Sequence, residues 1–264
     1  MIDFNEKKGF ICDMDGVIYH GNQILPGVAE FIDWLHRENK EYLFLTNNSG
    51  YTPRELQQKL ARMGLDVPEE HFYTSALATA AFLKKQAPGC SVYAIGEAGL
   101  LNALYDAGIT MNDVNPDYVV IGEGKGYTLD TLTKATNLVL KGAKLIGANS
   151  DLTGPIENGI MPACRALVAP IELATGKQAY FCGKPNPLMM RTGLDILGCH
   201  SAEAVMVGDR MDTDVIVGME SGMSTVLVLS GVSTRETIDT FAYRPSIVLD
   251  GVGNIVDIAE RQKK

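Results

Sequence analysis

The sequence lacks several features that would place a protein in a special class. It contains no apolar stretch long enough to span a bilayer, and its first residues, MIDFNEKKGF, lack the apolar core of a signal peptide. Basic residues are outnumbered, with 23 Lys and Arg against 32 Asp and Glu, which gives a formal net charge of -9. Nucleic-acid backbones recruit basic surfaces. We therefore expect no membrane segment and no nucleic-acid partner.

Paired cysteines are also missing. The five cysteines are odd in number and scattered, and they show neither CxxC spacing nor a disulfide framework. This pattern predicts reduced thiols and a cytoplasmic location. The remaining composition is ordinary for a globular protein, since 46% of the residues are hydrophobic and 21% are charged. The chain has 264 residues. That length suits one large domain or two modest ones.

Short β-rich runs alternate with helical patterns along most of the chain. Apolar strands are predicted at 10–12, 42–45, 92–95, 118–121, 144–147, 205–207 and 225–229. Residues 26–39 have helical spacing of apolar positions, and Thr52-Pro53-Arg54-Glu55 has the pattern of a capping box that opens a helix. Alternating strands and helices predict an α/β fold with a largely parallel sheet.

Polar side chains follow three of these predicted strands. Asp13 and Asp15 follow the first strand, Thr46 and Asn47 follow the second, and Asp209 follows the strand at 205–207. Ligands of open parallel sheets bind beyond the carboxyl ends of the strands. Residues 81–181 have their own strand–helix alternation but no comparable acidic strand end. We therefore predict a catalytic domain formed by 1–80 and 182–264, into which 81–181 is inserted as a second α/β domain.

The Asp13-Met14-Asp15-Gly16 stretch places two carboxylates on one face of an extended chain, where they repel each other. A cation would offset this repulsion, and hard oxygen ligands suit Mg²⁺. For this motif alone, a strand end with solvated acids and a glycine turn is an equally good interpretation.

A second acidic cluster, Gly208-Asp209-Arg210-Met211-Asp212-Thr213-Asp214, lies between a strand and a helix. Helix capping accounts for one of its acids but leaves Asp209 unexplained. Lys184 lies in a loop that prolines stiffen, GKPNP, which is unusual for a freely solvated lysine. The loop Gly122–Gly126 matches neither common phosphate-binding pattern and is interpreted as a strand-to-helix turn.

Taken in order, DMDG, LTNNS, GKPNP and GDRMDTD resemble the four motifs of the haloacid dehalogenase (HAD) superfamily of phosphotransferases. The stretches VPEEHFYTSALATAAFL, Asn149-Ser150-Asp151 and VLVLSGVSTRE are similar to the type IIA, NagD-like subfamily, so the resemblance covers essentially the whole chain. It implies a Rossmann-like core with a parallel sheet and helices on both faces, plus a smaller inserted α/β cap.

The resemblance also implies roles for residues that match the motifs. Asp13 would be the nucleophile and Asp15 the general acid and base. Thr46, Asn47 and Lys184 would bind the phosphoryl group, and Lys184 would also take part in catalysis. A Mg²⁺ ion would be held by the side chains of Asp13 and Asp209, by the carbonyl of Asp15 and, directly or through water, by Asp214.

The function implied is a Mg²⁺-dependent phosphomonoesterase that forms an aspartyl-phosphate intermediate on small phosphorylated metabolites. The resemblance favours nucleoside monophosphates, with sugar or aryl phosphates as alternatives, and it is compatible with a homodimer through cap surfaces. Asn149 and Asp151 are candidates for cap residues near the leaving group, with an ordinary Asx turn as the equal alternative. Two other functions stay open: a phosphoryl-accepting signalling domain and a non-catalytic phosphometabolite-binding protein.

Overall fold

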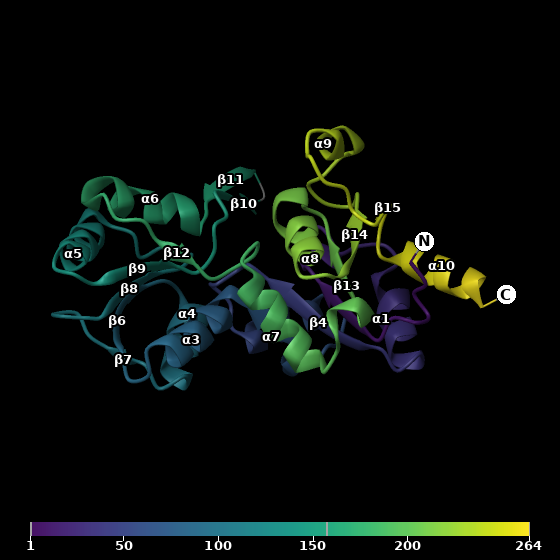
Figure 1. Ribbon diagram of the computed structural model, residues 1–264, viewed down its shortest axis with the longest axis horizontal. Helices are drawn as coiled ribbons and strands as arrows, with labels where there is room; N and C mark the ends of the chain where they lie inside the picture. The colour runs from purple at the N-terminus through teal and green to yellow at the C-terminus, as the bar shows by residue number, and fades with distance from the viewer. Residues whose placement is uncertain (1, 157, 264) are drawn as a thin grey trace. The chain divides into compact units, whose positions relative to one another are not determined.

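The computed structural model describes residues 2–156 and 158–263, which form two compact units (Figure 1). Unit 1 comprises Met1–Thr46, Gln57–Tyr73 and Pro187–Lys264, and unit 2 comprises Asn47–Leu56 and Thr74–Asn186. Unit 2 thus contains all of the expected insertion, 81–181, and also takes in 47–56, 74–80 and 182–186. The chain therefore crosses between the units more often than a single insertion requires.

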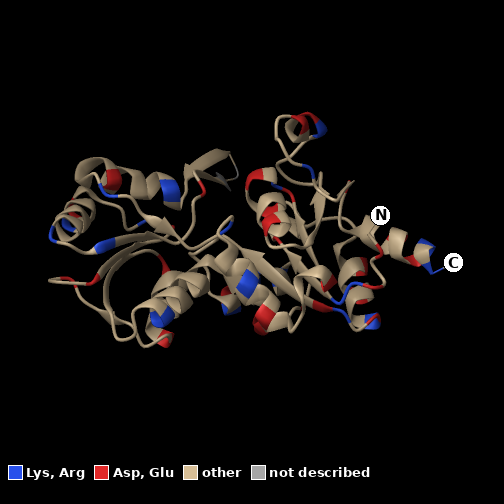
Figure 2. Cartoon of the chain, in the orientation of Figure 1, with Lys and Arg blue, Asp and Glu red and all other residues tan. Residues whose placement is uncertain are grey.

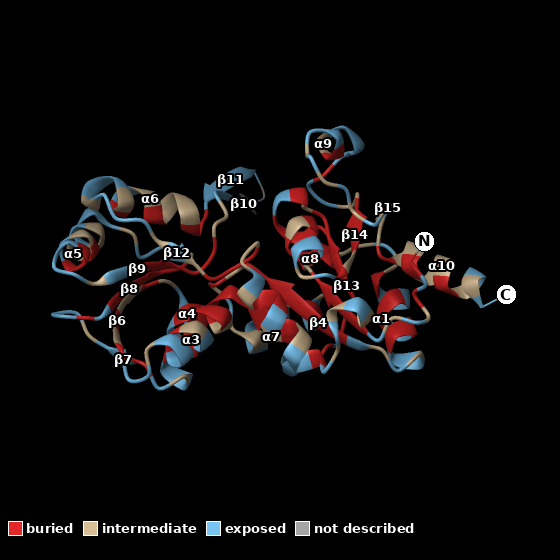
Figure 3. Cartoon of the chain, in the orientation of Figure 1, coloured by how far each residue is buried: buried red, intermediate tan, exposed pale blue. Residues whose placement is uncertain are grey.

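Unit 1 is built on a six-stranded sheet with the order β15-β14-β13-β1-β4-β5. Strand β1 runs parallel to β13 and β4, and β14 runs parallel to β13 and β15. The central strands are buried along almost their whole length (Figure 3), as expected for apolar runs covered on both faces. The strands are β1 (Gly9–Cys12), β4 (Glu41–Thr46), β5 (Phe72–Thr74), β13 (Ala204–Gly208), β14 (Ser224–Val228) and β15 (Ile247–Leu249).

The helices of unit 1 pack on this sheet with their apolar faces. In α1, the ring of Trp34 lies 5.5 Å from that of Phe10 on β1 and 6.2 Å from that of Phe31. A small hairpin, β2 (Tyr19–His20) with β3 (Gln23–Ile24), follows β1. The helical elements are α1 (Val28–Arg37), α2 (Pro53–Arg62, whose first residues are assigned to unit 2), η1 (Glu69–His71), α7 (Pro187–Leu197), η2 (Ser201–Glu203), η3 (Met211–Val215), α8 (Ile216–Glu220), α9 (Arg235–Asp239) and α10 (Gly253–Gln262).

Unit 2 has its own five-stranded parallel sheet with the order β12-β9-β8-β6-β7. The strands are β6 (Ser91–Ile95), β7 (Thr110–Met111), β8 (Tyr118–Ile121), β9 (Lys144–Gly147) and β12 (Tyr180–Phe181). A separate hairpin joins β10 (Thr153–Ile156) to β11 (Gly159–Pro162). The helices are α3 (Ser75–Gln86), α4 (Ala98–Asp106), α5 (Leu129–Leu140) and α6 (Cys164–Thr175).

Two hydrophobic cores cover the two faces of the unit 2 sheet. Val120 on β8 packs in a cluster with residues of α3 and α4, whereas its neighbours Val119 and Ile121 pack in a cluster with residues of α5 and α6. This division follows from the alternation of side chains along a strand. It explains why residues 118–121 are apolar without interruption.

The structure confirms the predicted α/β class, with parallel sheets that carry helices. Each strand predicted from an apolar run is present within one or two residues of its expected bounds. Acidic and basic residues are distributed over helices and loops of both units (Figure 2). Within residues 2–156 and 158–263, no helix combines the length and the apolar character needed to cross a membrane.

Candidate active site

Two neighbouring strands of unit 1 end in an aspartate. Asp13 follows β1 and Asp209 follows β13, and these strands pair in parallel with Cys12 opposite Val207. The backbone N–H of Asp13 donates a hydrogen bond of 2.8 Å to the carbonyl of Val207. Because carboxyl ends of parallel strands meet at one edge of a sheet, the two carboxylates lie close together.

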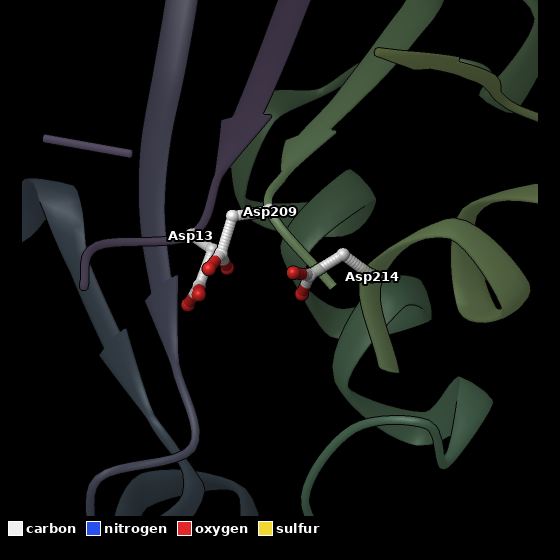
Figure 4. A group of neighbouring side chains, drawn as sticks. All are labelled: Asp13, Asp209 and Asp214. Atoms are coloured by element: carbon white, nitrogen blue, oxygen red, sulfur yellow. The ribbon is translucent and has the colours of Figure 1, made fainter. Parts of the chain in front are cut away.

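A third carboxylate joins them from η3. One carboxylate oxygen each from Asp13, Asp209 and Asp214 can be chosen so that all lie within 4.8 Å of one another. Figure 4 shows the carboxylate of Asp214 directed toward the other two. Asp209 and Asp214 are only 2% and 1% exposed, and Asp13 is partly buried. The structure thus brings together three of the acids predicted from the sequence.

Backbone groups fix the positions of the two buried acids. Asp209 accepts a hydrogen bond of 2.7 Å at Oδ2 from the N–H of Val232, and Asp214 accepts one of 3.1 Å at Oδ2 from the N–H of Arg210. A Cβ at Gly231 would stand 2.0 Å from the Asp209 Oδ2, so only glycine allows this approach. The loop after β14 is therefore shaped around the Asp209 carboxylate.

This arrangement fits a divalent metal ion. Burying three like charges so close together is costly, both through repulsion and through lost hydration. A cation among them offsets both costs, and carboxylate oxygens are the ligands that Mg²⁺ prefers. Within the described residues, Asp13, Asp209 and Asp214 are the group of three His, Cys, Asp or Glu side chains whose ligand atoms lie close enough together to hold one metal ion.

The Asp15 side chain lies outside this acidic group and has a different partner. Its Oδ2 accepts a hydrogen bond of 3.0 Å from the hydroxyl of Tyr19, in the hairpin that follows β1. The ammonium of Lys59 lies 3.8 Å from the centre of the Tyr19 ring. Burial lowers the pKa of Lys59, and the Asp15 carboxylate opposes that shift. Tyr19 is a further residue of the site that was not predicted from the sequence, although it lies only four positions after Asp15.

Thr46 is the last residue of β4, next to β1 in the sheet of unit 1, and it is buried. Asn47 follows it in the chain and belongs to unit 2. There the Asn47 side chain pairs with both backbone groups of Lys184: its Oδ1 accepts from the Lys184 N–H at 2.7 Å, and its Nδ2 donates to the Lys184 carbonyl at 3.0 Å. Asn47 Nδ2 also donates to Asp151 Oδ2 at 3.1 Å.

Lys184 is almost completely buried, at 2% exposure. The residue before it, Gly183, donates a 2.7 Å hydrogen bond to the carbonyl of Ala148. A Cβ at Gly183 would stand 2.7 Å from both the Asn149 Cβ and the Asn47 Oδ1. The alternative of a solvated surface lysine is therefore wrong.

Asn149 forms the Asx turn that the sequence offered as an alternative role. Its Oδ1 accepts a 3.1 Å hydrogen bond from the N–H of Asp151. Its Nδ2 donates to the Asn47 carbonyl and to Glu123 Oε1, both at 2.5 Å. The side chain is fully buried and uses its donors and acceptor within the protein. Glu123, which the sequence analysis left in a turn, is a further member of this network.

Two of the buried cysteines, Cys164 and Cys182, are poor candidates for a nucleophile. Burial raises the pKa of Cys182 to about 12 and also raises the pKa of Cys164. Because the thiolate is the reactive form, these protonated thiols are inert near neutral pH.

Comparisons with known proteins agree with the site. Residues 10–110 match the haloacid dehalogenase-like hydrolases, and residues 181–255 match the HAD-hydrolase-like family. The chain is 46% identical to a dihydroxyacetone phosphatase of Corynebacterium glutamicum, over 94% of this chain and 90% of that protein. It is 43% identical to the ribonucleotide monophosphatase NagD of Escherichia coli, over 94% of this chain and 98% of that protein.

A solved structure shows that the fold is also similar. The 4-nitrophenylphosphatase of Thermotoga maritima matches with a TM-score of 0.94 and 33% sequence identity, and the match covers 98% of this chain and 100% of that chain. Identity of this level over nearly the whole length, together with the acidic group at the strand ends, identifies the family. The chain belongs to the haloacid dehalogenase-like hydrolases and, among them, to the NagD-like phosphatases.

Proposed function

We propose that this chain is a Mg²⁺-dependent phosphomonoesterase that hydrolyses small phosphate monoesters through an aspartyl-phosphate intermediate on Asp13. The observation that carries the proposal is the group of Asp13, Asp209 and Asp214 at the carboxyl ends of β1 and β13. Asp13, Asp209 and Asp214 would hold the ion, with the backbone carbonyl of Asp15 as a further ligand. Mg²⁺, when bound, would neutralise the repulsion between the attacking carboxylate and the phosphate dianion.

In the first step, an Asp13 carboxylate oxygen attacks phosphorus and the bond to the leaving oxygen breaks. Asp15 gives its proton to that oxygen. In the second step, Asp15 takes a proton from the attacking water, and Asp13 and inorganic phosphate are released. Splitting one displacement into two lowers each barrier. The hydrogen bond between Tyr19 and Asp15 supports a fixed position for the proton carrier.

Phosphate binding is assigned to Thr46, Asn47 and Lys184. A lysine ammonium and loop N–H groups stabilise the negative charge of a transferring phosphoryl group. The pairing of the Asn47 side chain with the Lys184 backbone supports this assignment, because it fixes two of these residues relative to each other. Asp151, which is partly exposed and accepts from Asn47, is a better candidate for leaving-group contact than the buried Asn149.

The substrate class is proposed from the relatives. Their names cover dihydroxyacetone phosphate, ribonucleotide monophosphates and 4-nitrophenyl phosphate. We favour nucleoside monophosphates as substrates, with sugar and aryl phosphates as further members of the same class. The free thiols at all five cysteines support a reducing compartment such as the cytoplasm.

Phosphate release from a panel of monoesters tests the proposal, with and without Mg²⁺, for wild type and Asp13→Asn in parallel. We expect Mg²⁺-dependent release in wild type and none above background in the nearly isosteric variant. Equal rates in both proteins would remove Asp13 as the nucleophile. A stable acyl phosphate without turnover would favour the signalling function, and binding without either would favour the non-catalytic one.

A further inference from the structure

Glu123 follows β8, the central strand of the unit 2 sheet, at its carboxyl end. It lies in the glycine-rich loop that begins at Gly122, and its side chain is partly buried. The position is similar to that of Asp13 in unit 1, since both acids follow the carboxyl end of an apolar strand, Asp13 one residue after β1 and Glu123 two residues after β8. The function proposed above gives Glu123 no role.

The carboxylate of Glu123 accepts hydrogen bonds on both oxygens. Oε2 accepts from the backbone N–H of Ser49 at 2.9 Å and from the Ser49 hydroxyl, and Oε1 accepts from Asn149 Nδ2 at 2.5 Å. The backbone N–H of Glu123 in turn donates to Ser49 Oγ at 2.9 Å. Ser49 and Glu123 are therefore joined by reciprocal hydrogen bonds across 74 positions of sequence.

These contacts hold the segment that begins at Asn47. Ser49 lies two residues beyond Asn47, and Asn149 donates its second amide hydrogen to the Asn47 carbonyl at 2.5 Å. Asn47 then pairs through its side chain with the backbone of Lys184. A continuous series of hydrogen bonds thus leads from Glu123 to Asn47 and Lys184, two of the three residues assigned to phosphate binding.

A carboxylate suits this position better than an amide. Three donors face its two oxygens, and Ser49 and Asn149 are fully buried. A glutamine would present an NH₂ group to at least one of these donors, and an unsatisfied buried donor is costly. The low local dielectric strengthens the satisfied network and raises the cost of breaking it.

We propose that Glu123 is a positioning residue that fixes the Asn47–Ser49 segment and, through Asn47, the backbone of Lys184 for binding of the phosphoryl group. The inference rests on the proposed function of Asn47 and Lys184. Glu123 acts through these residues and takes no part in the chemical steps.

The test compares Glu123→Gln with wild type and with Glu97→Gln. Glu97 is an exposed acid whose Oε1 accepts from the N–H of Lys125, in the same loop as Glu123, so it controls for loss of a nearby charge. In Glu123→Gln we expect the KM for 4-nitrophenyl phosphate and the Kd for inorganic phosphate to rise about 10-fold. This is the size of effect expected when one buried hydrogen-bond donor loses its acceptor. The kcat should change less, and Glu97→Gln should match wild type.

Hydrogen exchange of the free protein supplies a readout that needs no turnover. Backbone amides of 47–51 and of Gly183, Lys184 and Asn186 should exchange faster in Glu123→Gln, while those of β6 and β8 stay protected. Ser49→Ala keeps the hydrogen bond from the Ser49 N–H but removes the hydroxyl that donates to Glu123 Oε2 and accepts from the Glu123 N–H, so it should change the same measurements in the same direction. It also serves if Glu123→Gln does not fold.

The outcomes separate the two proposals. Unchanged phosphate affinity and unchanged exchange at 47–51 in folded Glu123→Gln would overturn the role of Glu123. The role would equally be overturned by a uniform rise of exchange over the whole of unit 2, which indicates general loss of stability. If wild type neither hydrolyses the ester nor binds phosphate, the proposed function fails, and exchange at 47–51 and 183–186 still decides whether Glu123 holds the segment.

Discussion

At the scale of single residues, the two acids of the first motif have different surroundings. The carboxylate of Asp13 lies close to the buried carboxylates of Asp209 and Asp214. The carboxylate of Asp15 instead accepts a hydrogen bond from the hydroxyl of Tyr19. The proposed Mg²⁺ among these acids would favour the ionised form of Asp13, which is the form that a nucleophile needs. The Tyr19 hydroxyl holds the Asp15 side chain apart from this acidic group, which fits the separate role proposed for Asp15 as the proton carrier.

Asp15→Asn should therefore slow hydrolysis in a way that depends on the leaving group. For an alkyl phosphate, whose leaving oxygen needs a proton, we expect kcat to fall about 10²–10⁴-fold. For 4-nitrophenyl phosphate the first step needs less help, so its loss should be smaller. Asp212→Asn is the matched control, because Asp212 is an exposed acid that pairs with Arg210. Equal losses for both esters would contradict an acid role for Asp15.

Gly231→Ala tests whether the loop after β14 positions Asp209. The added methyl group would overlap the Asp209 carboxylate, so the side chain has to move. We expect the Mg²⁺ concentration for half-maximal activity to rise about 10–100-fold, as for lost support of a metal ligand. Gly251→Ala is the control, since the nearest atom to its added Cβ is 3.9 Å away. A Mg²⁺ requirement that stays at the wild-type value would show that Asp209 tolerates the change.

A site residue could be predicted from the sequence when it lies at the end of a long apolar strand. Asp13 and Asp209 could be brought together from sequence because strand ends share an edge of the sheet. Glu123 and Tyr19 could not be recognised as partners of Ser49 and Asp15. Glu123 also follows an apolar strand, but it is separated from β8 by Gly122 and lies among glycines that are typical of an ordinary turn.

At the scale of elements, long apolar runs were sufficient to locate the central strands. The strands that were not predicted lie at sheet edges or in two-stranded hairpins: β5, β7, β12 and β15 have two or three residues each, and β2 with β3 and β10 with β11 form hairpins. Such elements are defined by pairing with a neighbour rather than by their own pattern. The helix start at Thr52 was predicted and is confirmed, because the capping box is a local feature. Thr52 Oγ1 accepts from the N–H of Glu55 at 3.2 Å, and Glu55 Oε2 accepts from the N–H of Thr52 at 2.8 Å.

Thr52→Ala should remove this cap and destabilise the start of α2. We expect the free energy of unfolding to fall by about 1 kcal/mol, the usual contribution of an N-cap side chain. Urea unfolding followed by circular dichroism measures the change. Thr133→Ala, at an exposed site inside α5, is the control and should be neutral or slightly stabilising, since alanine favours helix interiors. A loss of equal size in both variants would assign the effect to threonine itself rather than to the cap.

At the scale of the whole molecule, the alternation of strands and helices predicted two α/β parts, but it did not predict which short segments belong to each part. The boundaries of unit 2 include 47–56 and 182–186, which the sequence analysis assigned to the catalytic domain. Asn47 pairs with Lys184 at a separation of 137 residues. Periodicity reports local conformation, whereas this grouping depends on contacts between distant segments.

The single tryptophan provides a probe for metal binding to unit 1. Trp34 is fully buried between Phe10 and Phe31 in the same unit as the acidic group. An ion that binds only the folded state raises its stability, by about 2.7 kcal/mol at a hundred times Kd. We therefore expect Mg²⁺ to raise the urea midpoint of Trp34 fluorescence in wild type and in Asp212→Asn. The increase should be largely lost in Asp209→Asn, which removes one charge from the acidic group. An equal increase in Asp209→Asn would place the stabilising ion elsewhere, and no increase in wild type would argue against Mg²⁺ binding by these three carboxylates.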